Sequence, residues 1–183
     1  MNSPGWIPRW AAAAAFLFVV GCHSQPKETS GEGVVAASGT WDFDQNAIVQ
    51  FPRGQFSYGW YGREESHLTG IAADMMGTPG DRLAPLGDRP IEGVTQEELK
   101  TLPYTHMPIV DYNHKTIHPG FSFAVQLRDG RYAKVTVTGY THRRDFSFKG
   151  ADTLSKFTKD DLLKGPDNAE YNLKVRWVLY GGS

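Results

Sequence analysis

The stretch FSFAVQLRDGRYAKVTVTGY, residues 121–140, alternates apolar and polar residues on both sides of an Asp-Gly pair. Period-two patterning around Asp-Gly predicts a β-hairpin. A two-residue loop would place Val125 opposite Lys134 and mix the two faces of the hairpin. A three-residue loop with Gly130 in the left-handed region pairs Val125 with Ala133 and gathers the apolar side chains on one face. We therefore expect a type I turn followed by a G1 bulge.

Further strands are predicted on both sides of this hairpin. The C-terminal segment YNLKVRWVLY, residues 171–180, has the same alternation. Residues 40–51 and 55–62 are rich in aromatic residues and bounded by Gly and Pro, which is typical of shorter strands. Residues 77–93 contain four Gly and three Pro, so we expect a long surface loop there.

Two short helices are predicted between the strands. Thr95 has the signature of an N-cap, with Glu98 three residues later and Pro103 as a stop. Residues 158–166 begin with Thr, carry acidic residues in the first turn and end at Gly-Pro. Together these elements predict an all-β fold, an antiparallel β-sandwich with one or two short helical insertions.

The N-terminus has the features of an exported, lipid-anchored protein. The apolar run of residues 10–20 is too short to span a bilayer, which needs about 20 apolar residues, but suits the core of a secretory signal. It leads through residues 19–21, Val-Val-Gly, into Cys22, the single cysteine of the chain. These four residues resemble the bacterial lipobox, and the resemblance implies cleavage before Cys22, its acylation, and, because His23 is not Asp, the outer membrane. Several acyl chains together give stable anchoring.

This interpretation divides the chain into three parts. Residues 1–21 are the signal peptide, and residues 22–38 are rich in Gly, Ser, Pro and charged residues, which predicts a flexible tether. Residues 39–183 then form a single β-sandwich domain. Removing residues 1–21 deletes one charge, Arg9, and leaves 18 basic and 20 acidic residues. This balance does not suggest nucleic-acid binding, which calls for a clustered basic face.

Three histidines lie close together in the sequence and raise the question of a metal site. A zinc site needs about three protein ligands that converge on one point. His118 precedes Pro119, which disfavours a helix that would bring His114 and His118 to one face. In an extended segment, residues four apart lie about 13 Å apart. A turn at Asn113 would be needed to assemble a site with His106, so solvated loop histidines are the simpler interpretation.

Other patterns that could indicate an enzyme are incomplete. Residues 42–46, DFDQN, begin like a calcium-binding loop, but Ala47 occupies its glycine position and Arg53 its glutamate position. The segment around Ser122 is similar to a nucleophile elbow, yet it lies in a regular alternating strand instead of a strained strand-to-helix turn. We therefore expect a protein that is not an enzyme.

The aromatic residues of the strand at 55–62 allow two interpretations. Large aromatic side chains commonly form half of a sandwich core. Alternatively, they line an apolar cleft for a flat ligand, edged by tyrosine hydroxyls. The residues concerned are Phe56, Tyr58, Trp60 and Tyr61.

The segment FAVQLRDGRYAKVTV, followed by a final strand near the C-terminus, resembles the C-terminal part of HmuY-like lipoproteins. The similarity covers about residues 118–180. It implies a lipid-anchored β-sandwich that binds a ligand, with haem as the candidate, and catalyses no reaction. The axial ligands of that family, His or Met on loops, have no matching motif in this chain.

Axial haem ligands must approach the iron from opposite sides, so they must lie on different connections. His106 or Met107 on one loop and His142 after the hairpin meet this condition, whereas His114 and His118 share one segment and are less able to oppose each other. Any haem ligation is therefore expected to join the segment of residues 106–118 to His142. The sequence thus predicts a lipid-anchored, non-enzymatic binding module of the cell envelope, and haem or another flat apolar molecule is its candidate ligand. The alternatives are a structural lipoprotein that binds an envelope protein and no small molecule, and a histidine-rich metal-binding protein.

Overall fold

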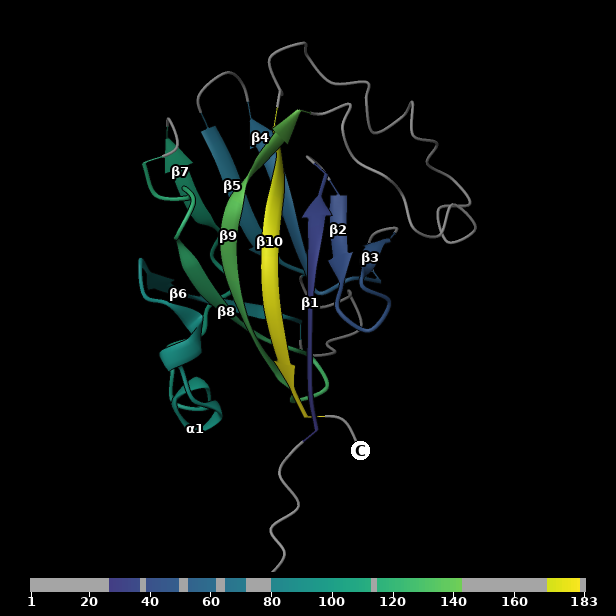
Figure 1. The fold of residues 1–183 in the computed structure, drawn as a ribbon, viewed down its shortest axis with the longest axis vertical. Helices are drawn as coiled ribbons and strands as arrows, with labels where there is room; N and C mark the ends of the chain where they lie inside the picture. The colour runs from purple at the N-terminus through teal and green to yellow at the C-terminus, as the bar shows by residue number, and fades with distance from the viewer. Residues whose placement is uncertain are drawn as a thin grey trace, which may run out of the picture.

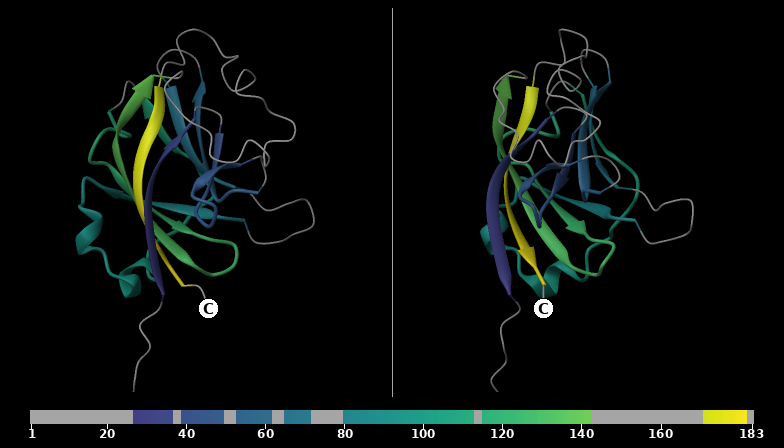
Figure 2. Two further views of the ribbon diagram at one scale, coloured as in Figure 1. Left: turned by 45° about the vertical axis from the view of Figure 1, so that its right-hand side comes forward. Right: turned by 90° about the vertical axis from the view of Figure 1, so that its right-hand side faces the viewer.

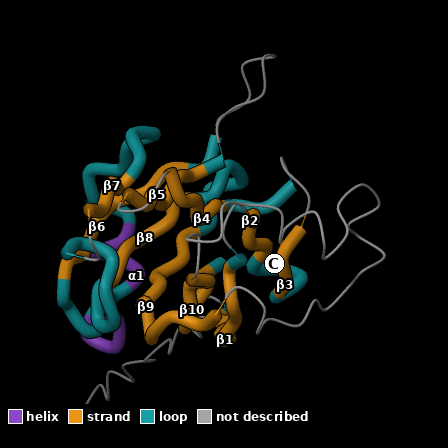
Figure 3. The backbone as a smooth tube through the Cα atoms, turned by 90° about the horizontal axis from the view of Figure 1, so that it is seen from above, coloured by secondary structure: helices purple, strands orange, loops and turns teal. Residues whose placement is uncertain are grey.

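The computed structural model describes residues 27–36, 39–49, 53–61, 65–71, 80–112, 115–142 and 171–181. These residues form two antiparallel sheets that pack face to face, as the view from above shows (Figure 3). The fold is an all-β sandwich, as predicted. Sheet A has the strand order β1 (Glu28–Val35), β10 (Tyr171–Tyr180), β9 (Tyr132–His142), β8 (Ser122–Gln126) and β6 (Arg82–Gly87) (Figure 1). Sheet B has the order β3 (Ala47–Val49), β2 (Gly39–Asp42), β4 (Phe56–Tyr61), β5 (Glu65–Gly70) and β7 (Ile109–Tyr112).

The β8–β9 hairpin has the predicted loop and register. Val125 pairs with Ala133, and the loop between the strands is closed by two backbone hydrogen bonds. The amide of Leu127 donates to the carbonyl of Arg131 at 2.8 Å, and the amide of Gly130 donates to the carbonyl of Leu127 at 2.9 Å. Gly130 has a φ of 87°, in the left-handed region that a G1 bulge requires.

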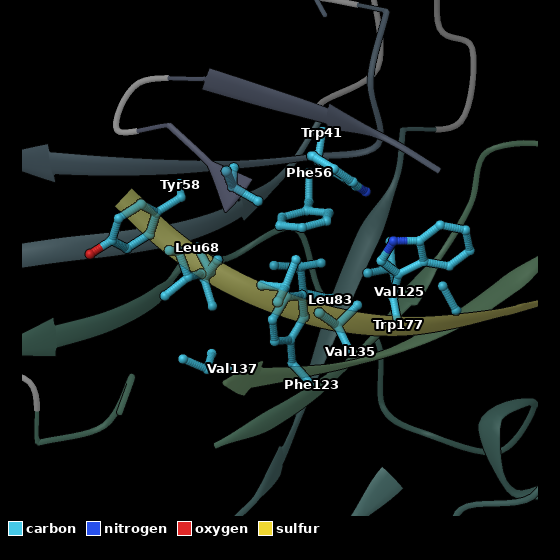
Figure 4. Close-up of a cluster of buried hydrophobic side chains, with 14 of the residues drawn as sticks. Trp41, Phe56, Tyr58, Leu68, Leu83, Phe123, Val125, Val135, Val137 and Trp177 are labelled. Carbon is cyan, nitrogen blue, oxygen red and sulfur yellow. The ribbon is translucent and has the colours of Figure 1, made fainter. Parts of the chain in front are cut away.

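The core lies between the two sheets and is rich in aromatic residues (Figure 4). The Phe56 ring from sheet B meets the Phe123 ring from sheet A edge to face, with centroids 5.4 Å apart. Such pairs add to the stabilisation from apolar burial. Tyr58 is fully buried beside them, so Phe56 and Tyr58 are core residues and do not edge an open cleft. The side chains of Trp60 and Tyr61 lie outside the described part of the structure.

The expectation of a tether as far as residue 38 is wrong for residues 28–35, which form β1 and pair along their length with β10. The folded part therefore begins at residue 28 and not at residue 39. A Cβ atom at Gly31 would lie 2.6 Å from the Trp177 ring, and one at Gly33 would collide with the Trp41 ring. The indoles thus cover the glycine backbone of an edge strand, which compensates for the missing side chains.

The expectation of a surface loop over residues 77–93 is also wrong, because β6 lies within it. Leu83 and Ala84 of β6 are buried. Because β6 is an edge strand of sheet A, Pro85 is tolerated there: it lacks a backbone N–H, but an edge strand does not need every N–H for ladder hydrogen bonds. Strands β5 and β7 are short and carry mixed polar and apolar residues, so the sequence pattern did not indicate them.

One of the two expected helices lies in the described part of the chain. The helix α1 (Gln96–Leu99) follows Thr95, whose hydroxyl accepts a hydrogen bond from the amide of Glu98 at 3.2 Å. It follows a short 3-10 turn, η1 (Ile91–Gly93), and both pack on the outer face of sheet A (Figures 1 and 3). Residues 158–166 lie outside the described residues.

An ion pair between a buried carboxylate and a partly exposed guanidinium ties the two sheets together at the hairpin end. The carboxylate of Asp81 is fully buried and accepts hydrogen bonds from Arg128: from its amide at 2.9 Å, Nε at 3.1 Å and Nη2 at 2.5 Å. Nη2 also donates to the carbonyl of Gly54 at 2.8 Å, just before β4 in sheet B. Burial raises the pKa of Asp81, and the bonds from Arg128 offset this in part.

Replacing Gly130 with Val should destabilise the protein by about 1–2 kcal/mol, since a β-branched residue is penalised at positive φ. A Cβ atom there would meet nothing within 4 Å, so the effect is conformational and not steric. Gly130→Asn is the matched control, because Asn tolerates this conformation, and it should lose less. Chemical denaturation of both variants measures the difference, and equal losses would contradict the left-handed turn.

Replacing Arg128 with Met should cost about 1–3 kcal/mol at neutral pH, because the buried Asp81 carboxylate keeps the backbone amide of residue 128 but loses the guanidinium. The variant raises the pKa of Asp81 further. A raised folded-state pKa means that stability is retained below the ordinary pKa of Asp and is lost as the pH rises, so the loss should shrink at pH about 3.

Denaturation curves at pH about 3 and about 7 test this sign. Lys100→Met, which breaks the exposed pair with Glu97 on α1, is the control and should change the stability by at most about 0.5 kcal/mol. A loss in Arg128→Met that is the same at both pH values would contradict the role given to the Asp81 charge.

Candidate binding groove beside strand β1

A groove of about 530 Å³ lies on the outer face of sheet A, between β1 and the turn η1. In the antiparallel register, Glu28, Ser30 and Glu32 of β1 lie directly opposite Tyr180, Val178 and Arg176 of β10. Residues that pair in this way share one face of the sheet. The groove is lined by these six residues together with Lys134 of β9 and with Ile91 and Glu92 of η1.

Lys134 anchors the wall of this groove to the sheet. Its side chain is 5% exposed, and Nζ donates to the carbonyl of Val94 at 2.8 Å. Nζ also lies 5.0 Å from the centroid of the Tyr180 ring, within range of a cation–π interaction. Because both contacts satisfy the buried ammonium group, Lys134 holds the segment after η1 in place over β9 and β10.

Some of the charged side chains at the rim of the groove form ion pairs, and others do not. Arg176 forms an ion pair with Glu92. The pKa of Glu92 lies below its ordinary value, chiefly because its own backbone amide donates to the carboxylate, with a smaller effect of Arg176. Glu28 and Glu32 are exposed, and neither forms an ion pair with any residue of the described part of the chain. The groove therefore presents two uncompensated carboxylates.

The groove runs along a strand edge. Strand β1 is the first strand of sheet A, and among the described strands its ladder partner is β10. Residues 28–30 are exposed, as is Glu32. The amide and carbonyl groups on the other side of such a strand are the groups that another chain can pair with. In Figure 2 the edge lies along the length of the sandwich, with β1 in purple.

The structure does not bring the predicted haem-ligand pair together. Thr105, next to His106, bridges to Leu83 of β6. Leu83 lies opposite Val125 of β8, which lies opposite Ala133, near the start of β9. His142 is the last residue of β9, so almost the whole strand, ~30 Å, separates the two positions. His106 and Met107 are exposed, Met107 at 71%. The side chain of His142 lies outside the described residues.

Of the remaining predicted site residues, the structure describes His118. His118 has Nε2 3.2 Å from the carboxylate of Asp88, and its Nδ1 lies 3.0 Å from the carbonyl of Pro119. His114 and Cys22 lie outside the described residues. Within the part of the chain that the structure describes, no group of three or more His, Cys, Asp and Glu side chains could hold a metal ion.

A second polar cluster lies at the end of the core opposite the hairpin loop. Asp111 of β7 is buried opposite Ser66 of β5 and accepts a hydrogen bond from the amide of Thr116 at 2.6 Å. The hydroxyl of Tyr140 donates to the carbonyl of Ile117, and burial raises the pKa of Tyr140, with a smaller contribution from Asp111. These contacts fix residues 116–117 against the two sheets, which is a structural role.

The sequence patterns did not indicate the groove, because one of its walls is β1, which the sequence did not predict. A signal was present: Glu28, Ser30 and Glu32 alternate with small residues, as in a strand with one polar face. Gly31 and Gly33 hid this alternation in a composition typical of linkers.

Comparison of the chain with protein-family models, with curated proteins and with solved structures found no match. The resemblance of residues 118–180 to HmuY-like lipoproteins and of residues 19–22 to the lipobox therefore stays a prediction. The described residues contain no helix of the length and apolar character needed to cross a membrane.

Proposed function

We propose that this protein is a lipid-anchored, non-enzymatic binding module of the bacterial cell envelope, held at the outer membrane through Cys22. The groove beside β1 is its binding surface. The observation that carries this proposal is the combination of a concave, partly apolar groove with two uncompensated carboxylates and an edge strand. Binding sites commonly join an apolar lining to a few placed polar groups in this way.

The contacts of the basic groove residues favour binding over catalysis. Arg176 is paired with Glu92, and Lys134 is held by a carbonyl and an aromatic ring. A catalytic base or nucleophile needs a group that is poised to exchange a proton or attack a substrate. These side chains instead fix the shape of the groove.

The proposed anchor places the groove close to the membrane. Five residues separate Cys22 from Glu28, where β1 begins, and the six residue steps between the two positions span at most about 20 Å. Glu28 pairs with Tyr180 at the end of the sandwich where the chain also ends (Figure 1). A ligand in the groove would therefore be held near the membrane surface.

The alternative, a lipoprotein that binds an envelope protein and no small molecule, is supported by the open edge of β1. Haem ligation by His106 and His142 is not part of the proposal, because the two positions lie at opposite ends of sheet A.

Replacing Cys22 with Ser should move the protein from the membrane fraction to the soluble fraction and abolish labelling by a palmitate analogue, because the acylated thiol is lost. Fractionation and metabolic labelling measure both effects. Gly130→Asn serves as the control, since a change in the hairpin should leave the anchor intact. If the wild-type protein associates with the membrane but takes up no palmitate analogue, the proposed acylation of Cys22 is wrong.

A photoreactive benzophenone side chain at position 30, in the groove, should form a defined adduct with the bound molecule in cells. The same group at position 97, on the exposed face of α1, is the control and should form none. Mass spectrometry identifies the adduct. If position 30 gives the same background as position 97, the groove is not the binding surface.

A further inference from the structure

We propose that the groove and the edge of β1 bind an extended, basic peptide segment of a partner protein, which adds to sheet A as a further strand. This inference rests on the proposed function and names the class of partner for the same site. Strand addition gives affinity through main-chain hydrogen bonds and specificity through alternate side chains.

The accessible part of the edge comprises residues 28–32. Four of these five residues are exposed, whereas Val35 at the other end of the strand is fully buried. The strand pairs with β10 throughout, so its backbone is already held in the extended form that a new strand needs. A template that is ordered before binding lowers the entropic cost of pairing.

The register of β1 decides which side chains of the peptide reach the groove. Glu28, Ser30 and Glu32 all lie on the outer face, since they oppose Tyr180, Val178 and Arg176. Successive residues of an added strand alternate between the faces, so every second peptide side chain would lie over the groove. Those side chains would meet Glu28 and Glu32 as cross-strand neighbours.

Charge selects the kind of peptide. Glu28 and Glu32 form no ion pair with a described residue, whereas the nearby cation Arg176 is already paired with Glu92. A Lys or Arg opposite each glutamate would supply the missing partner, and its methylene stem would cover apolar groove residues such as the half-buried Val178. Because the glutamates are four positions apart, the peptide should carry two basic residues with three residues between them.

The same charges disfavour a second copy of this chain as the occupant. Two β1 strands paired antiparallel would gather two copies each of Glu28 and Glu32 on one joint outer face, in any register that keeps the faces matched. Like charges opposite one another destabilise a strand pair. A basic segment of another protein is therefore the occupant that the edge favours.

The test uses the full acylated protein in detergent and two labelled, Thr-rich heptapeptides of identical composition. One peptide carries Lys at its second and sixth positions, which lie on one face of a strand. Its isomer carries Lys at the second and fifth positions, which lie on opposite faces. Fluorescence anisotropy should show tighter binding of the first peptide, weakened by added salt. Methylation of alternate peptide amides on the pairing side should abolish binding.

The double variant Glu28→Gln, Glu32→Gln should weaken binding of the first peptide by about threefold to tenfold, as expected for two exposed ion pairs. Glu97→Gln, which removes an exposed glutamate outside the groove, is the matched control and should bind as the wild type does. Both glutamates of β1 are exposed, so the variants should fold, and circular dichroism checks this.

Three outcomes would overturn the inference: equal binding of the two isomers, wild-type affinity in the double variant, or no binding of either peptide. A benzophenone adduct at position 30 with a lipid, a glycan or another non-peptide molecule would also overturn it, while leaving the proposed binding surface in place. The absence of any such adduct would instead remove the proposed function itself.

Discussion

The ion pair between the buried carboxylate of Asp81 and the partly exposed guanidinium of Arg128 is the constraint on which the closure of the sandwich at the hairpin end depends. Arg128 is part of the β8–β9 turn in sheet A, and its guanidinium also binds the carbonyl of Gly54 next to sheet B. A buried carboxylate without its partner is unfavourable, so closure of the sheets at this end is most stable when the turn places Arg128 against Asp81. Gly130 fixes that turn through its positive φ, so the local conformation of one hairpin positions both sheets.

The groove is a consequence of how the two faces of sheet A are used. The inner face packs on sheet B, whereas η1 and α1 cover only part of the outer face, where Val94 and Leu99 lie against Ala84 and Ala124. Lys134 marks the boundary of this cover, since its ammonium group holds the Val94 carbonyl. Beyond it, Arg176 of β10 and Glu28, Ser30 and Glu32 of β1 are exposed on this face. The insertion between β6 and β7 thus supplies both the small second core and one wall of the groove.

Elements of this fold were predictable from the sequence where they depend on local patterns, and were missed where they depend on contacts between strands. The hairpin and β10 were predicted because alternation and turn chemistry are local, and Thr95 was predicted as a cap for the same reason. Strand β1 was not predicted, since Gly31 and Gly33 pack against tryptophan rings of other strands, Trp177 and Trp41. The groove depends on β1 and was missed with it. The distance between the ends of sheet A, which separates the expected haem ligands, is likewise a tertiary property.

The two edges of sheet A are protected in different ways, and the difference bears on function. The edge at β6 carries Pro85 and is bridged by Thr105, so it offers little backbone to another chain. Within the described residues, the edge at β1 carries no proline and no bridging segment, and it presents the charges of Glu28 and Glu32. Charges repel a like-charged strand but attract an oppositely charged one, so they block self-association while permitting a basic partner. Protection alone could be given by a proline or a bridging segment, as at β6. The combination of a charged edge strand with a groove beside it therefore supports the proposal that this edge recognises a partner.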